Sequence, residues 1–217
     1  MLILLPPSEG KARPDTSEPM DLGSLVFAKE LGERREQLLD AFDPNLGKAP
    51  AAPASEVYTG VLYGRLELPK LSQRARGRVL IASALWGFVR PDDRIPYYKF
   101  PPKTKLEGIG APAAYWRPAL AEALFDEEGE LIVDMRSGAY TSFWKPKQAT
   151  LLAVRAFTEQ DGEPKAVSHM AKAVRGDVAR VLLQAKKAPK DPDEATRVAE
   201  SAGFTVELND GNLDVIV

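Results

Sequence analysis

The sequence lacks several residues on which common protein chemistry depends. Among its 217 residues there is no cysteine and a single histidine, His169. The first absence excludes disulfides, thiolate nucleophiles, cysteine-ligated zinc and iron–sulfur clusters, and the second excludes a multi-histidine metal site within one chain. A carboxylate metal site stays open, but no pattern favours one. We therefore expect no cofactor and no metal.

Long hydrophobic runs are also missing. No apolar stretch approaches the roughly 18 residues of a membrane-spanning helix. The apolar start, residues 1–5, has no basic residues before it and is too short for a signal peptide. Pro6 and Pro7 follow it, so it reads as a short buried strand that the prolines end. We expect a cytoplasmic protein with no membrane partner.

The composition is otherwise that of a globular protein. Hydrophobic residues make up 44% of the chain and charged residues 28%, which is close to the averages for folded domains. At this length we expect one domain over residues 1–217.

The net charge of −2 hides two basic blocks. Residues 65–117 and 136–190 each carry 11 basic and 4 acidic side chains, and the rest of the chain is acidic. The two blocks could form one positive cleft. They could also pair with the acidic segments as ordinary surface salt bridges, and the pattern alone leaves both interpretations open.

Hydrophobic periodicity and turn residues predict an α+β fold, with a mixed sheet, flanking helices and a C-terminal hairpin. The expected strands are 1–5, 78–85, 131–135, a hairpin of 150–157 with 166–168, and a second hairpin of 204–208 with 213–217. The expected helices are 25–42, 169–187 and a last one that Asp191 caps and Gly203 ends. Residues 11–24 and 43–55 have loop composition.

The helix predicted over 169–187 has two different faces. Its apolar stripe consists of Met170, Val174, Val178, Val181 and Ala185. The opposite face is basic and consists of His169, Lys172, Arg175, Arg180, Lys186 and Lys187. That face either contacts a ligand or is simply solvated. A lone histidine at a helix start is more often a cap or surface residue than an acid–base catalyst.

Polar and basic residues follow several of the predicted strands, where loops are rigidly positioned. Lys11 ends a Pro-Pro-Ser-Glu-Gly-Lys segment that is no Walker A loop. It could hold an anion, but taken alone it is better explained as a simple turn after an edge strand. Residues 83–99 combine basic residues with Trp86 and two tyrosines, which suits phosphate contacts and base stacking, or else arginine–aspartate pairs that fix the loop. Residues 134–147 again place Arg136 and Lys145 after a strand.

Taken together, the motifs resemble those of the YaaA peroxide-stress resistance family. They are, in order, LILLPPSEGK, EVYTG, SALWGFVRPDDRIPYYKF, YWR, VDMRSGAYTSFWKPK, SHMAKAVRGDVARVL and ESAGF. The resemblance runs from residue 1 to about residue 208, and the block 83–99 with the A-K-x-x-R-G element at 171–176 is its most specific part.

The resemblance implies a single-domain fold with a positively charged cleft that binds duplex or branched DNA. It also implies a role in limiting free iron and oxidative DNA damage during hydrogen peroxide stress, and it brings no settled enzymatic activity. Carried onto this sequence, the cleft residues are Lys11, Tyr58, Arg90, Lys99, Arg136, Lys145, Lys172 and Arg175. Longer relatives carry a helix–hairpin–helix-like element before the Tyr-Thr-Gly motif, and the proline-rich 43–55 interval holds no copy.

Two functions follow as hypotheses. In the first, the cleft binds DNA weakly and in a salt-dependent way, with Tyr58, Trp86 and Tyr97 available for stacking. About four to six phosphate contacts would give a slope of log K against log salt of about −4 to −5. In the second, the same cleft is the active site of an enzyme that acts on a small anionic or nucleotide-like ligand. Direct iron binding is less favoured, because it would need mostly carboxylate ligands.

Overall fold

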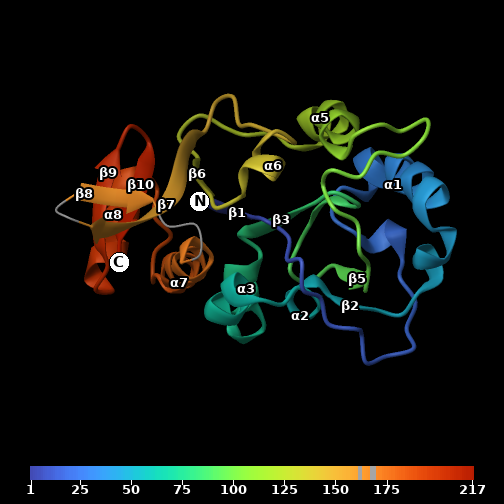
Figure 1. Ribbon diagram of the computed structural model, residues 1–217, viewed down its shortest axis with the longest axis horizontal. Helices are drawn as coiled ribbons and strands as arrows, with labels where there is room; N and C mark the ends of the chain where they lie inside the picture. The colour runs from blue at the N-terminus through green and yellow to red at the C-terminus, as the bar shows by residue number, and fades with distance from the viewer. Residues whose placement is uncertain (161–162, 167–169) are drawn as a thin grey trace.

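The computed structural model describes residues 1–160, 163–166 and 170–217 (Figure 1). His169, singled out in the sequence, lies outside the described residues. The strands are β1 (Leu2–Leu5), β2 (Ala51–Pro53), β3 (Val79–Ser83), β4 (Gly87–Val89), β5 (Arg94–Pro96), β6 (Leu131–Asp134), β7 (Thr150–Gln160), β8 (Glu163–Ala166), β9 (Thr205–Asn209) and β10 (Asn212–Ile216).

The α-helices are α1 (Ala28–Phe42), α2 (Ala54–Val57), α3 (Val61–Leu66), α4 (Gln73–Arg76), α5 (Pro112–Ala123), α6 (Gly138–Thr141), α7 (Ala171–Gln184) and α8 (Pro192–Ser201). Three short 3-10 helices, η1 (Leu22–Ser24), η2 (Pro44–Lys48) and η3 (Leu68–Lys70), lie in the connections. In the described part of the chain, no helix is long and apolar enough to cross a membrane.

A mixed sheet runs through the molecule in the order β4-β3-β1-β6-β7-β10-β9, with β8 paired to β7. Five adjacent strands, β3, β1, β6, β7 and β10, run parallel to one another. The strands β4, β8 and β9 pair antiparallel with β3, β7 and β10, respectively. β1, β3 and β6 are buried on both faces, which explains their continuous apolar sequences. The predicted α+β fold with a mixed sheet is confirmed.

β7 joins the two halves of this sheet. Its first residues, 150–153, pair with β6, and its last, 157–160, pair with β8. The predicted hairpin is confirmed at its Phe157–Ala166 pair, and both its strands extend into the segment expected to be loop. Residues 167–168 of the predicted second strand lie outside the described residues. On the other side, residues 153–157 of β7 pair with β10.

The C-terminal hairpin is also confirmed. Its turn places Asp210 at φ 47° and Gly211 at φ 75°, the left-handed conformations of a type I′ turn. Pairing of β10 with β7 adds the hairpin to the main sheet. Figure 1 shows α8, β9 and β10 together at one end of the long axis, with α1 and α5 at the other.

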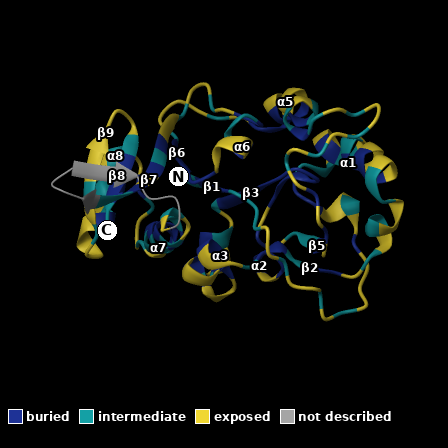
Figure 2. Ribbon diagram, in the orientation of Figure 1, coloured by how far each residue is buried: buried dark blue, intermediate teal, exposed yellow. Residues whose placement is uncertain are grey.

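Two predicted helices differ in detail. α1 begins at Ala28 rather than residue 25, because Phe27 has a left-handed backbone with φ 58°. In α7 the buried stripe runs through Val174, Val178 and Leu182, whereas Met170 is 48% exposed. Val174 and Val178 of the predicted stripe are confirmed, whereas Val181 and Ala185 are only half-buried. The buried face is shifted toward Leu182 and Leu183, because α7 packs against α3 as well as β7. Figure 2 shows the buried residues along the sheet and the inner faces of the helices.

Candidate functional site

A cavity of about 700 Å³ opens at the carboxyl ends of β1 and β6. It is lined by the loop 6–11 after β1, by Ser137, Ala139 and Tyr140 after β6, by residues 59–63 and 98–102, and by the first turn of α7. β1 lies between β3 and β6, and the chain leaves β1 for β3 on one side before it returns to β6 on the other. The crevice at such a divergence is the usual ligand site of parallel sheets.

The floor of the cavity is made by two segments far apart in the sequence. The amide of Ala12 donates to the carbonyl of Val57 at 2.8 Å, and that of Thr59 donates to Gly10 at 3.1 Å. The Ser8 hydroxyl donates to the carbonyl of Thr59. Gly60 has φ 101°, and a Cβ there would lie 3.1 Å from Ser8 Oγ. The Pro-Pro-Ser-Glu-Gly-Lys and Tyr-Thr-Gly motifs therefore form one structure.

Lys11 lies on this floor above two aromatic rings. Its Nζ donates to the carbonyl of Ser8 at 2.7 Å and lies 4.5 Å from the centre of the Tyr98 ring and 5.6 Å from that of Tyr58. Burial lowers the pKa of Lys11 to about 8, and the carboxylate of Glu9 opposes this effect. The ammonium has two further hydrogens available for a ligand.

Tyr58 and Tyr98 support Lys11 from below. Their hydroxyls are 2.6 Å apart, and Ser83 Oγ is 2.8 Å from the hydroxyl of Tyr98. Burial raises the pKa of each tyrosine well above the ordinary value for tyrosine, so both hydroxyls are neutral near pH 7. The sequence analysis included Tyr98 among the aromatic residues of the 83–99 block but gave no role to Ser83. Alternation along Pro-Tyr-Tyr-Lys puts one tyrosine inward and the next outward.

The predicted stacking surface is wrong for two of its three rings. Tyr58 is 1% exposed and Trp86 is fully buried, because both pack in the core beneath the cavity. Tyr97 is 36% exposed, and the Arg13 guanidinium lies 4.5 Å from its ring centre. Of the three, only Tyr97 is open to a ligand.

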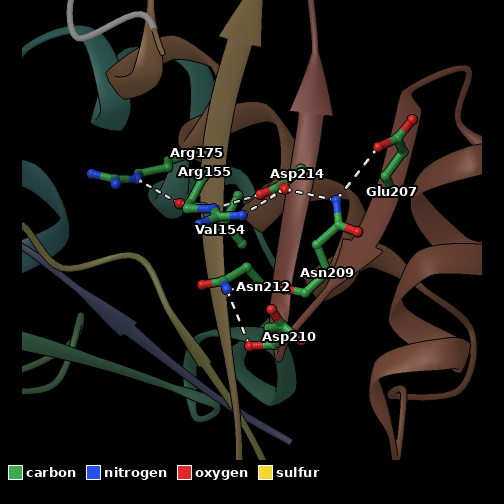
Figure 3. Close-up of polar contacts among 8 residues, drawn as sticks. All are labelled: Val154, Arg155, Arg175, Glu207, Asn209, Asp210, Asn212 and Asp214. Atoms are coloured by element: carbon green, nitrogen blue, oxygen red, sulfur yellow. Dashed lines mark hydrogen bonds and ion pairs between the residues drawn. The ribbon is translucent and has the colours of Figure 1, made fainter. Parts of the chain in front are cut away.

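Lys172 and Arg175 enter the cavity lining from α7. Nε of Arg175 donates to the carbonyl of Val154 at 3.1 Å, and Figure 3 shows its terminal nitrogens pointing away from β7 and the Arg155–Asp214 pair. Burial lowers the pKa of Arg175, and Asp134 opposes this effect. The position of α7 depends on Gly176, where a Cβ would overlap the Leu62 carbonyl and lie 2.8 Å from Cβ of Arg65.

Four of the eight predicted residues thus line one cavity: Lys11, Lys99, Lys172 and Arg175. Within the described chain, none of the four forms an ion pair with a carboxylate, and Glu9 is the one acidic residue in the lining.

The other four lie elsewhere. Tyr58 is beneath the floor, and Arg90 and Lys145 are exposed outside the lining. Arg136 is 4% exposed and donates to the Asp134 carboxylate at 2.7 and 2.9 Å and to the carbonyls of Tyr140 and Trp144 at 3.2 and 2.9 Å. Since these bonds fix the loop that brings Tyr140 to the cavity, Arg136 supports the site without facing it.

Within the described residues, no group of three or more histidine or acidic side chains could hold a metal ion. The lining of the cavity includes the side chains of Lys11, Lys99, Lys172 and Arg175 and the hydroxyls of serine, threonine and tyrosine residues. Ammonium and guanidinium groups donate their strongest hydrogen bonds to anions.

A family model described as "Peroxide stress protein YaaA" matches residues 15–209. The chain belongs to the YaaA family of peroxide stress proteins. A UPF0246 protein of Streptomyces coelicolor is 38% identical, over 95% of this chain and 92% of its own length. A UPF0246 protein of Corynebacterium efficiens is 36% identical, over 100% and 98%, and a protein of Campylobacter jejuni is 32% identical, over 81% and 82%. The YaaA-family resemblance of the sequence motifs is confirmed.

Proposed function

We propose that this YaaA-family protein binds DNA by its phosphates at the cavity beside β1, as a cytoplasmic protein that limits oxidative DNA damage and free iron during peroxide stress. The observation that carries the proposal is the meeting of Lys11, Lys99, Lys172 and Arg175, from separate segments, around one opening. Phosphate oxygens accept hydrogen bonds from lysine and arginine regardless of DNA sequence.

The cations of the cavity, rather than the charge of the whole molecule, set the strength of such binding. The chain is acidic overall, with a net charge of −2, so attraction comes from the local field of the cavity rather than from the whole surface. Four cations that each neutralise one phosphate give a slope of log K against log salt of about −3 to −4 on duplex DNA. The affinity is modest and falls steeply with salt.

The test is fluorescence anisotropy with duplex, branched and single-stranded DNA across a salt series. The double variant Lys172→Ala/Arg175→Ala should flatten the slope by about two. The matched control is Arg90→Ala/Lys145→Ala, which removes two predicted residues that lie outside the lining and should leave the slope unchanged. Equal losses in both variants, or no binding at low salt, would reject DNA binding at this cavity.

A second candidate is an enzyme that acts on a small anionic or nucleotide-like ligand. It is favoured by the position of Lys11, whose ammonium lies on aromatic rings at the floor of a cavity with the volume of a typical ligand pocket. A thermal-shift series with nucleotides tests it. Selective stabilisation by one nucleotide, lost in Lys11→Met but kept in the Arg90→Ala/Lys145→Ala control, would favour the enzyme.

A further inference from the structure

A second basic pocket lies near the amino end of β3, whereas the cavity beside β1 lies at the carboxyl ends of the parallel strands. Its cavity has a volume of about 500 Å³. One side is lined by residues from 70–78, and the other side by residues from 183–188, which include the last turn of α7. Arg78 marks the amino end of β3, and its carbonyl accepts from the amide of Ile3 at 2.8 Å. We call this the basal pocket. It shares no lining residue with the cavity beside β1.

The charged residues that line the basal pocket are all basic. Four basic residues face it, and none of its described lining residues is acidic; the basic ones are Lys70, Arg74, Arg78 and Lys186. Lys70 pairs with Glu67. Arg74, Arg78 and Lys186 form no ion pair with any carboxylate of the described chain.

Arg78 is the deepest of these cations. Its Nη2 donates to the carbonyl of Leu183 at 2.6 Å. This bond satisfies a carbonyl in the last turn of α7, which would otherwise repel an anion. Its Nε and Nη1 are buried, and no acceptor for either exists among the described residues. Buried guanidinium nitrogens are normally hydrogen-bonded, so these two N–H groups favour an acceptor that comes from outside the chain.

From these observations we propose that the basal pocket is a phosphate-binding site. Arg78 provides buried donors, and Arg74 and Lys186 provide exposed positive charge at the opening. A phosphate group matches this set better than a carboxylate, because it carries up to two negative charges and has enough oxygens for several donors. The phosphate belongs either to a small phosphorylated molecule or to the backbone of a nucleic acid.

The test is a titration with inorganic pyrophosphate at fixed ionic strength, followed by amide NMR. It uses the Lys172→Ala/Arg175→Ala background, so that the outcome does not depend on the cavity beside β1. We expect saturable shifts in the amides of residues 72–78 and 183–188. Adding Arg74→Ala/Lys186→Ala should weaken the apparent affinity at least tenfold. Both side chains are exposed and unpaired within the described chain, so the fold should persist.

The matched control adds Lys29→Ala/Arg197→Ala, two exposed residues outside the basal pocket, and should bind pyrophosphate like the background. Absence of shifts, or equal weakening by both double variants, would overturn the proposal. A parallel titration with a 20-base-pair duplex identifies the source of the phosphate. Shifts of the same amides by duplex indicate a DNA backbone, and shifts by pyrophosphate alone indicate a small molecule.

Discussion

At the scale of single residues, Lys11 and Arg136 show how similar sequence contexts lead to different roles. Both follow a buried strand of the parallel sheet. Lys11 ends with its ammonium in the cavity lining, whereas Arg136 turns back onto Asp134 and two carbonyls. Each has an acidic residue two positions earlier, but Asp134 is 6% exposed and holds the Arg136 guanidinium in a bidentate pair. Glu9 is exposed and forms no ion pair with Lys11 in the described chain.

The first prediction concerns the titration of Lys11. Its pKa is about 8 in the folded chain and its ordinary value is 10.5, so between these values the unfolded chain holds a proton that the folded chain has released. The free energy of unfolding should therefore rise with pH across this window. Urea unfolding at pH 7.5 and pH 10 measures the rise, and the Lys11→Met variant should show a smaller one. An equal rise in both would show that Lys11 is not its source.

The second prediction concerns the buried ion pair. Arg136→Leu leaves the Asp134 carboxylate buried without its partner, which should lower the free energy of unfolding by about 3–5 kcal/mol. The Arg65–Asp177 pair is the control, because the Arg65 side chain is 59% exposed, and Arg65→Gln should cost far less. Urea denaturation of both variants measures the difference, and similar losses would contradict a supporting role for Arg136.

At the scale of elements, the contact between α3 and α7 positions two of the four cavity cations. The Ala-Lys-x-x-Arg-Gly element puts Gly176 one turn after Lys172, on the face of α7 that meets α3. Because glycine has no Cβ, the helices approach closely there, and Lys172 and Arg175 lie next to residues 59–63. This explains the glycine of the motif by packing rather than by ligand contact.

The third prediction tests that contact. Gly176→Ala places a Cβ against the Leu62 carbonyl and should destabilise the protein by about 1–3 kcal/mol, despite the higher helix propensity of alanine. Gly32→Ala in α1 is the control, since no atom lies within 4 Å of a Cβ there, and it should stabilise by up to about 1 kcal/mol. Thermal unfolding compares the two. Stabilisation by both would mean that α3 and α7 are not in close contact.

At the scale of the whole molecule, one sheet extends from β4 to β9, and β2 and β5 pair in a separate two-stranded sheet. β7 pairs with β6, β8 and β10, and Arg155 on β7 donates to Asp214 on β10 at 2.6 Å through both Nε and Nη2. Figure 3 shows Asn209 donating to the same carboxylate. The C-terminal hairpin is thus bonded to the central strands.

The fourth prediction follows from this continuity. Unfolding should be a single cooperative transition, with calorimetric and van't Hoff enthalpies that agree. Asp214→Asn removes the charge that pairs with Arg155 and should lower the midpoint temperature without splitting the transition. Differential scanning calorimetry measures both. Two transitions in the unmodified chain would show that the hairpin end and the rest fold independently.

Much of the fold could be predicted because its signals are local. The apolar runs of β1, β3 and β6, the Asp191 cap of α8, which accepts from the Glu194 amide at 2.7 Å, and the turn at Asp210–Gly211 each depend on neighbouring residues. The motifs of the YaaA family were recognisable for the same reason. The fold class, most strands of the main sheet and the candidate cations were therefore open to sequence analysis. The short strands β2, β4 and β5 were not predicted, and β2 lies in the 43–55 interval that was expected to be a loop.

Tertiary structure decided what those cations do. Arg35 is on the Leu31–Leu38 face of α1 and is fully buried, with its guanidinium bonded to the carbonyls of Trp86, Val26 and Phe88. Helical spacing places Arg35, rather than Arg34 one residue earlier, on that face. It does not supply the three carbonyls that accept from the guanidinium, because these come from segments outside α1. The order of strands, the burial of Arg136 and the meeting of Lys11 with Lys172 likewise depend on contacts between distant residues. The free energy of such contacts is absent from any short stretch of sequence, so only the folded chain determines them.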